Sequence, residues 1–85
     1  MKEFERRILK TIIRAMELME YEEELHSIED IKERAEIDSL AVLEILVTLE
    51  EEFDISLDEA EITVEVAKDL KTLSCIIDGK LKDKK

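Results

Sequence analysis

Apolar side chains recur every three or four residues at the start of the chain, which is the period of an amphipathic helix. The stripe consists of Phe4, Ile8, Leu9, Ile12, Ile13, Met16 and Met19. It predicts a helix over about residues 2–20. Residues 21–37 lose this period and are expected to form a long connection. A turn of helix is predicted near 27–34, where Ser27 and Asp30 resemble a capping box.

The rest of the chain predicts two further helices. One covers about 39–53, where Asp38 and Ser39 are both good N-cap residues. The last covers about 64–78, with Thr63 as a possible N-cap and Gly79 as its stop. Between them, residues 57–62 have room only for a short helical turn. Residues 80–85 are expected to form a tail.

Composition supports an all-α fold. The chain has one glycine and no proline, whereas a turn-rich β fold needs many of both. With 85 residues, we expect a single domain over 1–85. The predicted architecture is a small bundle of three main helices, with a short helical turn between the last two.

The net charge of −11 is unevenly spread along the chain. Residues 1–14 hold five basic side chains, whereas residues 15–65 hold nineteen acidic and only two basic ones. Such a field repels nucleic acid and anionic membranes and attracts proteins with basic patches. No apolar run approaches the roughly 18–20 residues that span a bilayer. We therefore expect a cytoplasmic monomer without nucleic-acid partners or membrane spans.

Catalysis and metal binding are not expected from the residues present. His26 is the only histidine and lies among glutamates, without a serine or cysteine in a matching pattern. Cys75 is the only cysteine and lacks partners for a metal site. The sequence therefore predicts a protein that is not an enzyme.

The helix expected at 39–53 separates two faces at 100° per residue. The predicted core face consists of Val42, Ile45, Leu46, Leu49 and Phe53. The opposite face consists of Leu40, Glu44, Val47, Thr48 and Glu51, with Glu50, Glu52 and Asp54 widening its acidic rim. Apolar side chains with a charged surround are typical of a recognition surface. The alternative is that this face packs beneath the 21–37 connection.

Ser39 lies where this helix begins. Unpaired N–H groups and the positive end of the helix dipole suit a phosphate ester at that place. By itself, however, a serine in this position is usually only a helix cap.

This part of the sequence resembles the acyl carrier protein family. Asp38-Ser39-Leu40 is similar to the attachment motif of the family, and residues 42–44 and 49–54 are similar to its second helix. The resemblance implies that Ser39 carries a covalent 4′-phosphopantetheine arm, with Asp38 as part of the motif. It also implies that Leu40, Glu44, Val47 and Glu51 form the docking face for partner enzymes.

A carrier of this kind holds acyl groups as thioesters on the arm. It shuttles them between enzymes of fatty-acid, polyketide or related biosynthesis. Its partners would be a phosphopantetheinyl transferase of the holo-carrier synthase type and acyl ligases, synthases or acyltransferases with basic patches. Two alternatives remain open: an aminoacyl or peptidyl carrier of the same fold, and an acidic helical interaction protein in which Ser39 only caps a helix.

Several departures from the family pattern favour a specialised carrier. Glu36 stands where the family usually has a glycine, and Ala41 replaces a frequent acid. The 57–62 segment is shorter than the usual third helix and lacks its common proline. The basic cluster on the first helix, which consists of Arg6, Arg7, Lys10 and Arg14, is unusually prominent.

Overall fold

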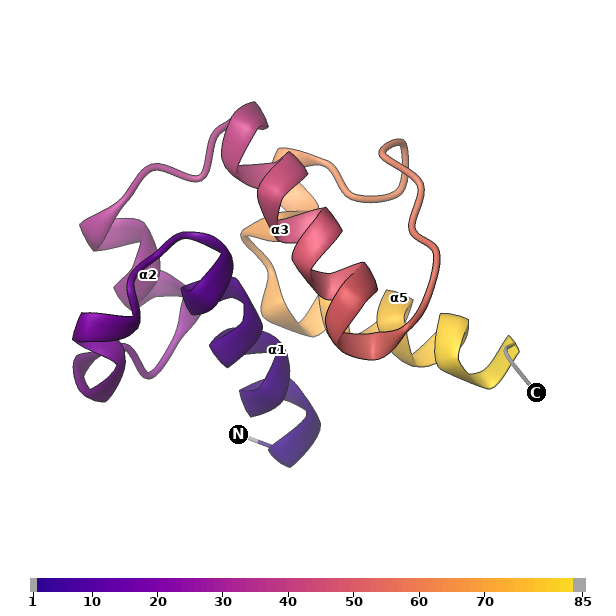
Figure 1. Ribbon diagram of the computed structural model, residues 1–85, viewed down its shortest axis with the longest axis horizontal. Coiled ribbons are helices and arrows are strands. Elements are labelled where there is room, and N and C mark those ends of the chain that lie inside the picture. The colour runs from indigo at the N-terminus through magenta and orange to yellow at the C-terminus, as the bar shows by residue number, and fades with distance from the viewer. Residues whose placement is uncertain (1, 84–85) are drawn as a thin grey trace.

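The protein is an all-helical bundle, as predicted (Figure 1). The computed structural model describes residues 2–83, and within them all regular structure is helical. In chain order the elements are α1 (Glu3–Ala15), the 3-10 helix η1 (Met19–Glu24), α2 (Ile28–Arg34), α3 (Ser39–Phe53), α4 (Val64–Ala67) and α5 (Leu70–Asp83). No helix among residues 2–83 has both the length and the apolar character needed to cross a bilayer.

Helices α1, α3 and α5 supply the centre of the core. Their fully buried side chains are Ile8, Ile12, Ile13, Ile45, Leu49, Leu73 and Ile77. Burying an aliphatic side chain of this size stabilises a fold by about 1.5–3 kcal/mol. The 21–37 connection is fastened to the same cluster by Leu25, Ile28, Ile31 and Ile37.

Helix α3 spans the range expected from the hydrophobic pattern. Its buried residues are Val42, Ile45, Leu46, Leu49 and Phe53, the same five that the pattern places on the core face. On the opposite face Leu40, Glu44, Val47 and Glu51 are exposed, and Thr48 is half-buried.

The short helix α2 begins with half of the expected capping box, because Asp30 bonds to the N–H of His26 and not to that of the cap residue Ser27. The Ser27 hydroxyl accepts from the Asp30 N–H at 3.2 Å, while the Asp30 carboxylate accepts from the His26 N–H at 2.8 Å. The Ser27 hydroxyl thus satisfies one N–H group that the first turn would leave unpaired, and the Asp30 carboxylate binds the residue before the cap.

Helix α1 ends at Ala15, so the prediction that it continues to residue 20 is wrong. Glu17 has a left-handed backbone with φ 57°. The Leu18 N–H then donates to the Ile13 carbonyl at 2.9 Å, and the Glu17 N–H donates to the Arg14 carbonyl at 3.1 Å. These bonds make a Schellman motif, which turns the chain away. Met19 consequently leaves the core stripe and is 53% exposed.

Replacement of Glu17 by glycine is expected to stabilise the fold. A left-handed residue with a Cβ costs about 1–2 kcal/mol, and the exposed Glu17 side chain makes no hydrogen bond within residues 2–83 that would offset this cost. After the entropy lost on folding a glycine, we expect a net gain of about 0.5–1 kcal/mol. Urea unfolding should show a higher midpoint with an unchanged slope. A lower midpoint would contradict the strain at Glu17.

In the segment after α3 the expected short turn is confirmed, whereas the last helix differs from the prediction. The short turn expected over 57–62 is a single hydrogen-bonded turn, in which the Ile62 N–H donates to the Asp58 carbonyl at 3.3 Å. The helix expected over 64–78 is divided into α4 and α5. The division lies at Asp69, whose carboxylate accepts from the Thr72 N–H at 3.3 Å and from its hydroxyl at 2.8 Å. Asp69 thereby caps α5, and these bonds lower the pKa of its carboxyl.

Gly79 does not end the last helix, so the prediction that it is the stop is wrong. Helix α5 runs through it, and the expected tail is helical over residues 80–83, while residues 84–85 lie outside the described part. Tertiary contacts extend the helix, because Leu81 packs against the core and Lys80 pairs with Glu61 at 3.1 Å. Lys80 and Lys82 also suit the negative end of the helix dipole.

Replacement of Gly79 by alanine should therefore stabilise the protein. A Cβ at this exposed position meets nothing within 4 Å. Alanine is favoured over glycine by about 0.8–1 kcal/mol inside a helix. The unfolding free energy should rise by about that amount in urea denaturation. An unchanged value would indicate that the last turn of α5 is not formed in solution.

Candidate attachment site and docking face

Ser39 is the first residue of α3, and the cap of this helix is Asp38. The Asp38 carboxylate accepts from the Ala41 N–H at 2.9 Å. The alternative in which Ser39 is merely a helix cap is therefore wrong. The sequence could not decide between these two adjacent residues, because aspartate and serine are equally good caps.

The Ser39 side chain is exposed and free to react. Within residues 2–83 its hydroxyl makes no hydrogen bond, and the N–H groups of Ser39 and Leu40 have no partner. Helix α3 is 15 residues long, so its dipole and these N–H groups favour negative charge at the Ser39 oxygen. The position thus fits the phosphodiester through which a phosphopantetheine arm would be attached.

A groove of about 260 Å³ opens beside Ser39. It lies between α3 and the segment that leads into α4. Its apolar lining consists of Val42, Leu43, Leu46, Ile62 and Val64, and Ser39, Glu59 and Thr63 complete it. The groove lies slightly below the range of roughly 300–1,000 Å³ typical of drug-sized ligands.

The face of α3 opposite the core is open to solvent. Leu40 is 65% exposed and Val47 is 51% exposed, so the alternative in which they pack beneath the 21–37 connection is wrong. Glu44 lies between them and Glu51 one turn beyond Val47; both are exposed and form no ion pair within residues 2–83. These four residues, which we call the docking face, combine apolar side chains with unneutralised carboxylates.

Leu43 adjoins the docking face, although the sequence pattern did not place it there. Its side chain is 42% exposed and lines the groove beside Ser39. It also lines a second groove, of about 500 Å³, between the end of α1 and α3, where Glu17 stands near Glu44 and Glu51. Leu43 lies three residues after Leu40 and four before Val47, and this helical spacing could have placed it next to both.

Glu52 does not belong to the acidic rim expected next to this face. It is held by two arginines of α1: Arg7 Nε lies 2.9 Å from Glu52 Oε2, and Arg14 Nη2 lies 3.2 Å from Oε1. Hydrogen bonds from Arg7, and then from Arg14, lower the pKa of the Glu52 carboxyl. The Arg7 guanidinium also stacks on Phe53, 4.4 Å from the ring centre. Two residues of the basic cluster, Arg7 and Arg14, therefore connect α1 to the end of α3.

The Glu52 clamp predicts a pH-dependent contribution to stability. Because the pKa is lowered on folding, the contribution is complete above the ordinary glutamate pKa and is lost as the pH falls through the folded-state value. We expect Glu52→Gln to cost about 0.5–1 kcal/mol at neutral pH. The difference from the wild type should shrink as the pH falls below the ordinary glutamate range and through the lowered pKa of Glu52.

Urea unfolding at several pH values measures this difference. Glu51→Gln is the matched control, because Glu51 is the adjacent carboxylate and has no ion-pair partner within residues 2–83. A Glu52→Gln deficit that persists unchanged in acid would contradict the clamp.

The remaining sequence expectations concern metal binding and nucleophilic chemistry at His26 and Cys75. Among residues 2–83, no three His, Cys, Asp or Glu side chains are placed to hold a metal ion. His26 and Cys75 are both exposed.

A helical bundle with a free serine at the start of its central helix is typical of carrier domains that bear a prosthetic arm. The family described as phosphopantetheine attachment site matches residues 6–74, and the chain belongs to this family. The domain is therefore a site of covalent 4′-phosphopantetheine attachment, and its family consists of carriers rather than catalysts. No curated protein and no solved structure gives a significant match to the chain.

Proposed function

We propose that Ser39 bears the phosphopantetheine arm and that the protein carries acyl groups on it between cytoplasmic biosynthetic enzymes. The terminal thiol of the arm supplies the thioester chemistry. The observation that carries the proposal is the Ser39 hydroxyl, which is exposed and without a hydrogen bond within residues 2–83, while Asp38 takes the capping role. A serine with no structural task is available to a transferase.

The groove beside Ser39 supports an acyl cargo. Five of its lining residues are valine, leucine or isoleucine, which suit a hydrocarbon chain, and its polar members are Ser39, Glu59 and Thr63. Its volume of about 260 Å³ suits a short chain or the first carbons of a longer one. We therefore favour fatty-acid, polyketide or related biosynthesis over peptide synthesis.

The docking face supports partners with basic surfaces. Glu44 and Glu51 attract arginine and lysine side chains, while Leu40 and Val47 offer an apolar contact. Charge-steered association is fast and sensitive to salt, which suits a carrier that visits several enzymes. The expected partners are a phosphopantetheinyl transferase and an acyl ligase, synthase or acyltransferase.

Intact mass spectrometry tests this proposal directly. The chain is incubated with coenzyme A, magnesium and a broad-specificity phosphopantetheinyl transferase. We expect a gain of one phosphopantetheine group, located by peptide mapping on the fragment that contains Ser39. No gain with several transferases would overturn the proposal, and a gain on another fragment would move the site.

A further inference from the structure

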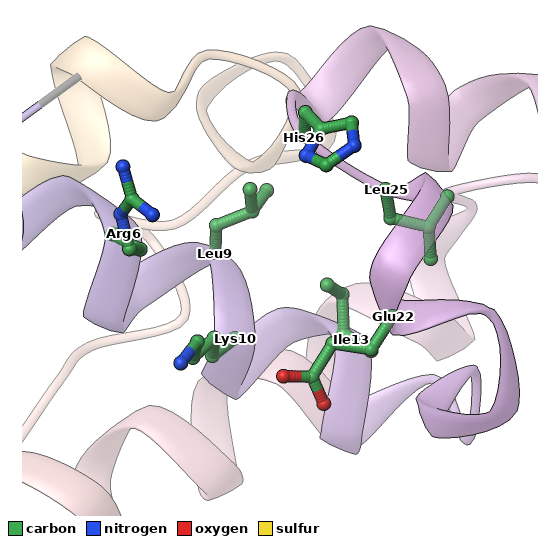
Figure 2. Close-up of a pocket in the computed structure, with 7 residues that line it drawn as sticks. All are labelled: Arg6, Leu9, Lys10, Ile13, Glu22, Leu25 and His26. Carbon is green, nitrogen blue, oxygen red and sulfur yellow. The ribbon is translucent and has the colours of Figure 1, made fainter.

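A separate pocket of about 230 Å³ lies between α1 on one side and η1 with the two residues that follow it on the other (Figure 2). Leu9 and Ile13, on successive turns of α1, form its floor together with Leu25. All three are core residues with at most 4% of their surface exposed. The pocket is thus a gap in the cover of the core, and it shares no lining residue with the groove beside Ser39.

Three nitrogen-bearing side chains, Arg6, Lys10 and His26, also line this pocket (Figure 2). Arg6 and Lys10 are exposed and one helical turn apart. Within residues 2–83 neither forms an ion pair, although their neighbours Arg7 and Arg14 both bind Glu52. In a chain with 24 acidic and 13 basic residues, two unpaired cations at one pocket are a local reversal of the charge.

The remaining lining residue, Glu22, is acidic and makes one end of the pocket less favourable for an anion than the other. In the view of Figure 2 its carboxylate lies beside Ile13, on the same side as Lys10 and away from Arg6. It would repel an anion placed at that end. The backbone N–H of His26 donates to the Asp30 carboxylate within the cap of α2. An anionic group is therefore favoured at Arg6 and Lys10, the two cations of the pocket.

We propose that this pocket binds a small amphipathic anion, a carboxylate on a short hydrocarbon tail. The carboxylate would accept hydrogen bonds from Arg6 and Lys10, and the tail would cover Leu9, Ile13 and Leu25. The volume of about 230 Å³ is too small for a folded partner to enter. The proposal uses no residue of the attachment site, so it stands or falls separately from the proposed function.

Methyl and amide NMR of the full chain, titrated with octanoate, tests this proposal. We expect saturable shifts centred on Leu9, Ile13 and Leu25, with a Kd on the order of 1 mM or tighter. Octanol should bind at least about threefold more weakly, since it lacks the charge, and octylamine should not saturate. The Ser39→Ala protein should bind octanoate as the wild type does.

Point variants locate the charged group. Arg6→Ala and Lys10→Ala should each weaken octanoate binding about threefold, and the double variant about tenfold. Glu22→Gln should strengthen it about twofold, because a repulsive charge is removed. The matched control is Lys71→Ala on α5, an exposed lysine without an ion pair within residues 2–83, which should change nothing.

Three outcomes would overturn the proposal. Shifts centred on Leu46, Ile62 and Val64 would place the hydrocarbon in the groove beside Ser39. Equal affinity for octanol, or no effect of the Arg6 and Lys10 variants, would show apolar contact without anion recognition. Saturable binding of a poly-glutamate peptide to the same residues, with none of octanoate, would assign the cations to an acidic protein partner.

Discussion

A Ser39→Ala variant is expected to gain no phosphopantetheine under conditions that load the wild type completely. The hydroxyl oxygen of Ser39 is the nucleophile in the proposed attachment, and alanine leaves no atom to form the ester. The loss should be total rather than graded. After reaction with coenzyme A, magnesium and transferase, intact mass should show the wild type shifted by one phosphopantetheine group and the variant unshifted.

The structure explains why this variant should remain folded. Asp38, not Ser39, accepts the capping hydrogen bond of α3, and the Ser39 side chain contributes none within residues 2–83. Alanine is also a good helix former at the first position. Circular dichroism and the urea midpoint should therefore stay close to those of the wild type. A folded variant that is not loaded separates the loss of the nucleophile from the loss of the fold.

Ser74→Ala is the control for a serine that has no expected role in attachment. Ser74 is a half-buried residue of α5 whose hydroxyl donates to the Lys71 carbonyl at 2.8 Å. This variant should load like the wild type. Loading that survives in Ser39→Ala would instead direct attention to Ser56, which is exposed in the segment after α3.

Helix α3 could be predicted from sequence because its signal is local and repeated. Five apolar residues at helical spacing define the buried side, and Asp38 marks the beginning. The exposed positions of Leu40 and Val47 follow from the same helical period. The docking face could therefore be predicted from the spacing of residues within one helix.

The ends of the other helices depend on interactions that leave little trace in the sequence. Helix α1 stops in a Schellman motif built on Glu17, where the usual glycine signal is missing. Gly79 carries that signal but lies inside α5, because Leu81 and the Lys80–Glu61 pair hold the last turn in place. At the end of α1, Glu17 adopts the left-handed backbone at the cost of strain. At the end of α5, tertiary contacts outweigh the low helix propensity of Gly79.

The basic cluster on α1 shows a further limit of prediction from sequence. Five cations near the N-terminus appear equivalent in the sequence. In the structure Arg7 and Arg14 neutralise Glu52, while Arg6 and Lys10 remain unpaired at the pocket floored by Leu9. Pairing between residues about 40 positions apart is set by the packing of α1 on α3, which charge patterns along the chain do not encode.

Reversal of both docking carboxylates, Glu44→Lys with Glu51→Lys, is expected to lower kcat/KM for the phosphopantetheinyl transferase by about 10–100-fold at low ionic strength. The two substitutions replace attraction with repulsion at the surface that meets a basic partner. The deficit should shrink as salt is added, because exposed charges are screened over about 10 Å at 0.1 M. Steady-state loading rates at several salt concentrations measure both effects.

The matched control is Glu29→Lys with Glu33→Lys, which makes the same change in net charge on another helix. Both residues are exposed on α2, four positions apart. If the effect arises only from the total charge, the two double variants should be equally impaired. If α3 is the surface that contacts the partner, the α2 variant should lose less than about threefold, because its charges lie outside the contact. Equal impairment of the two double variants would mean that α3 acts only through long-range attraction. No impairment in either double variant would exclude the docking face of α3 as the surface that contacts the transferase.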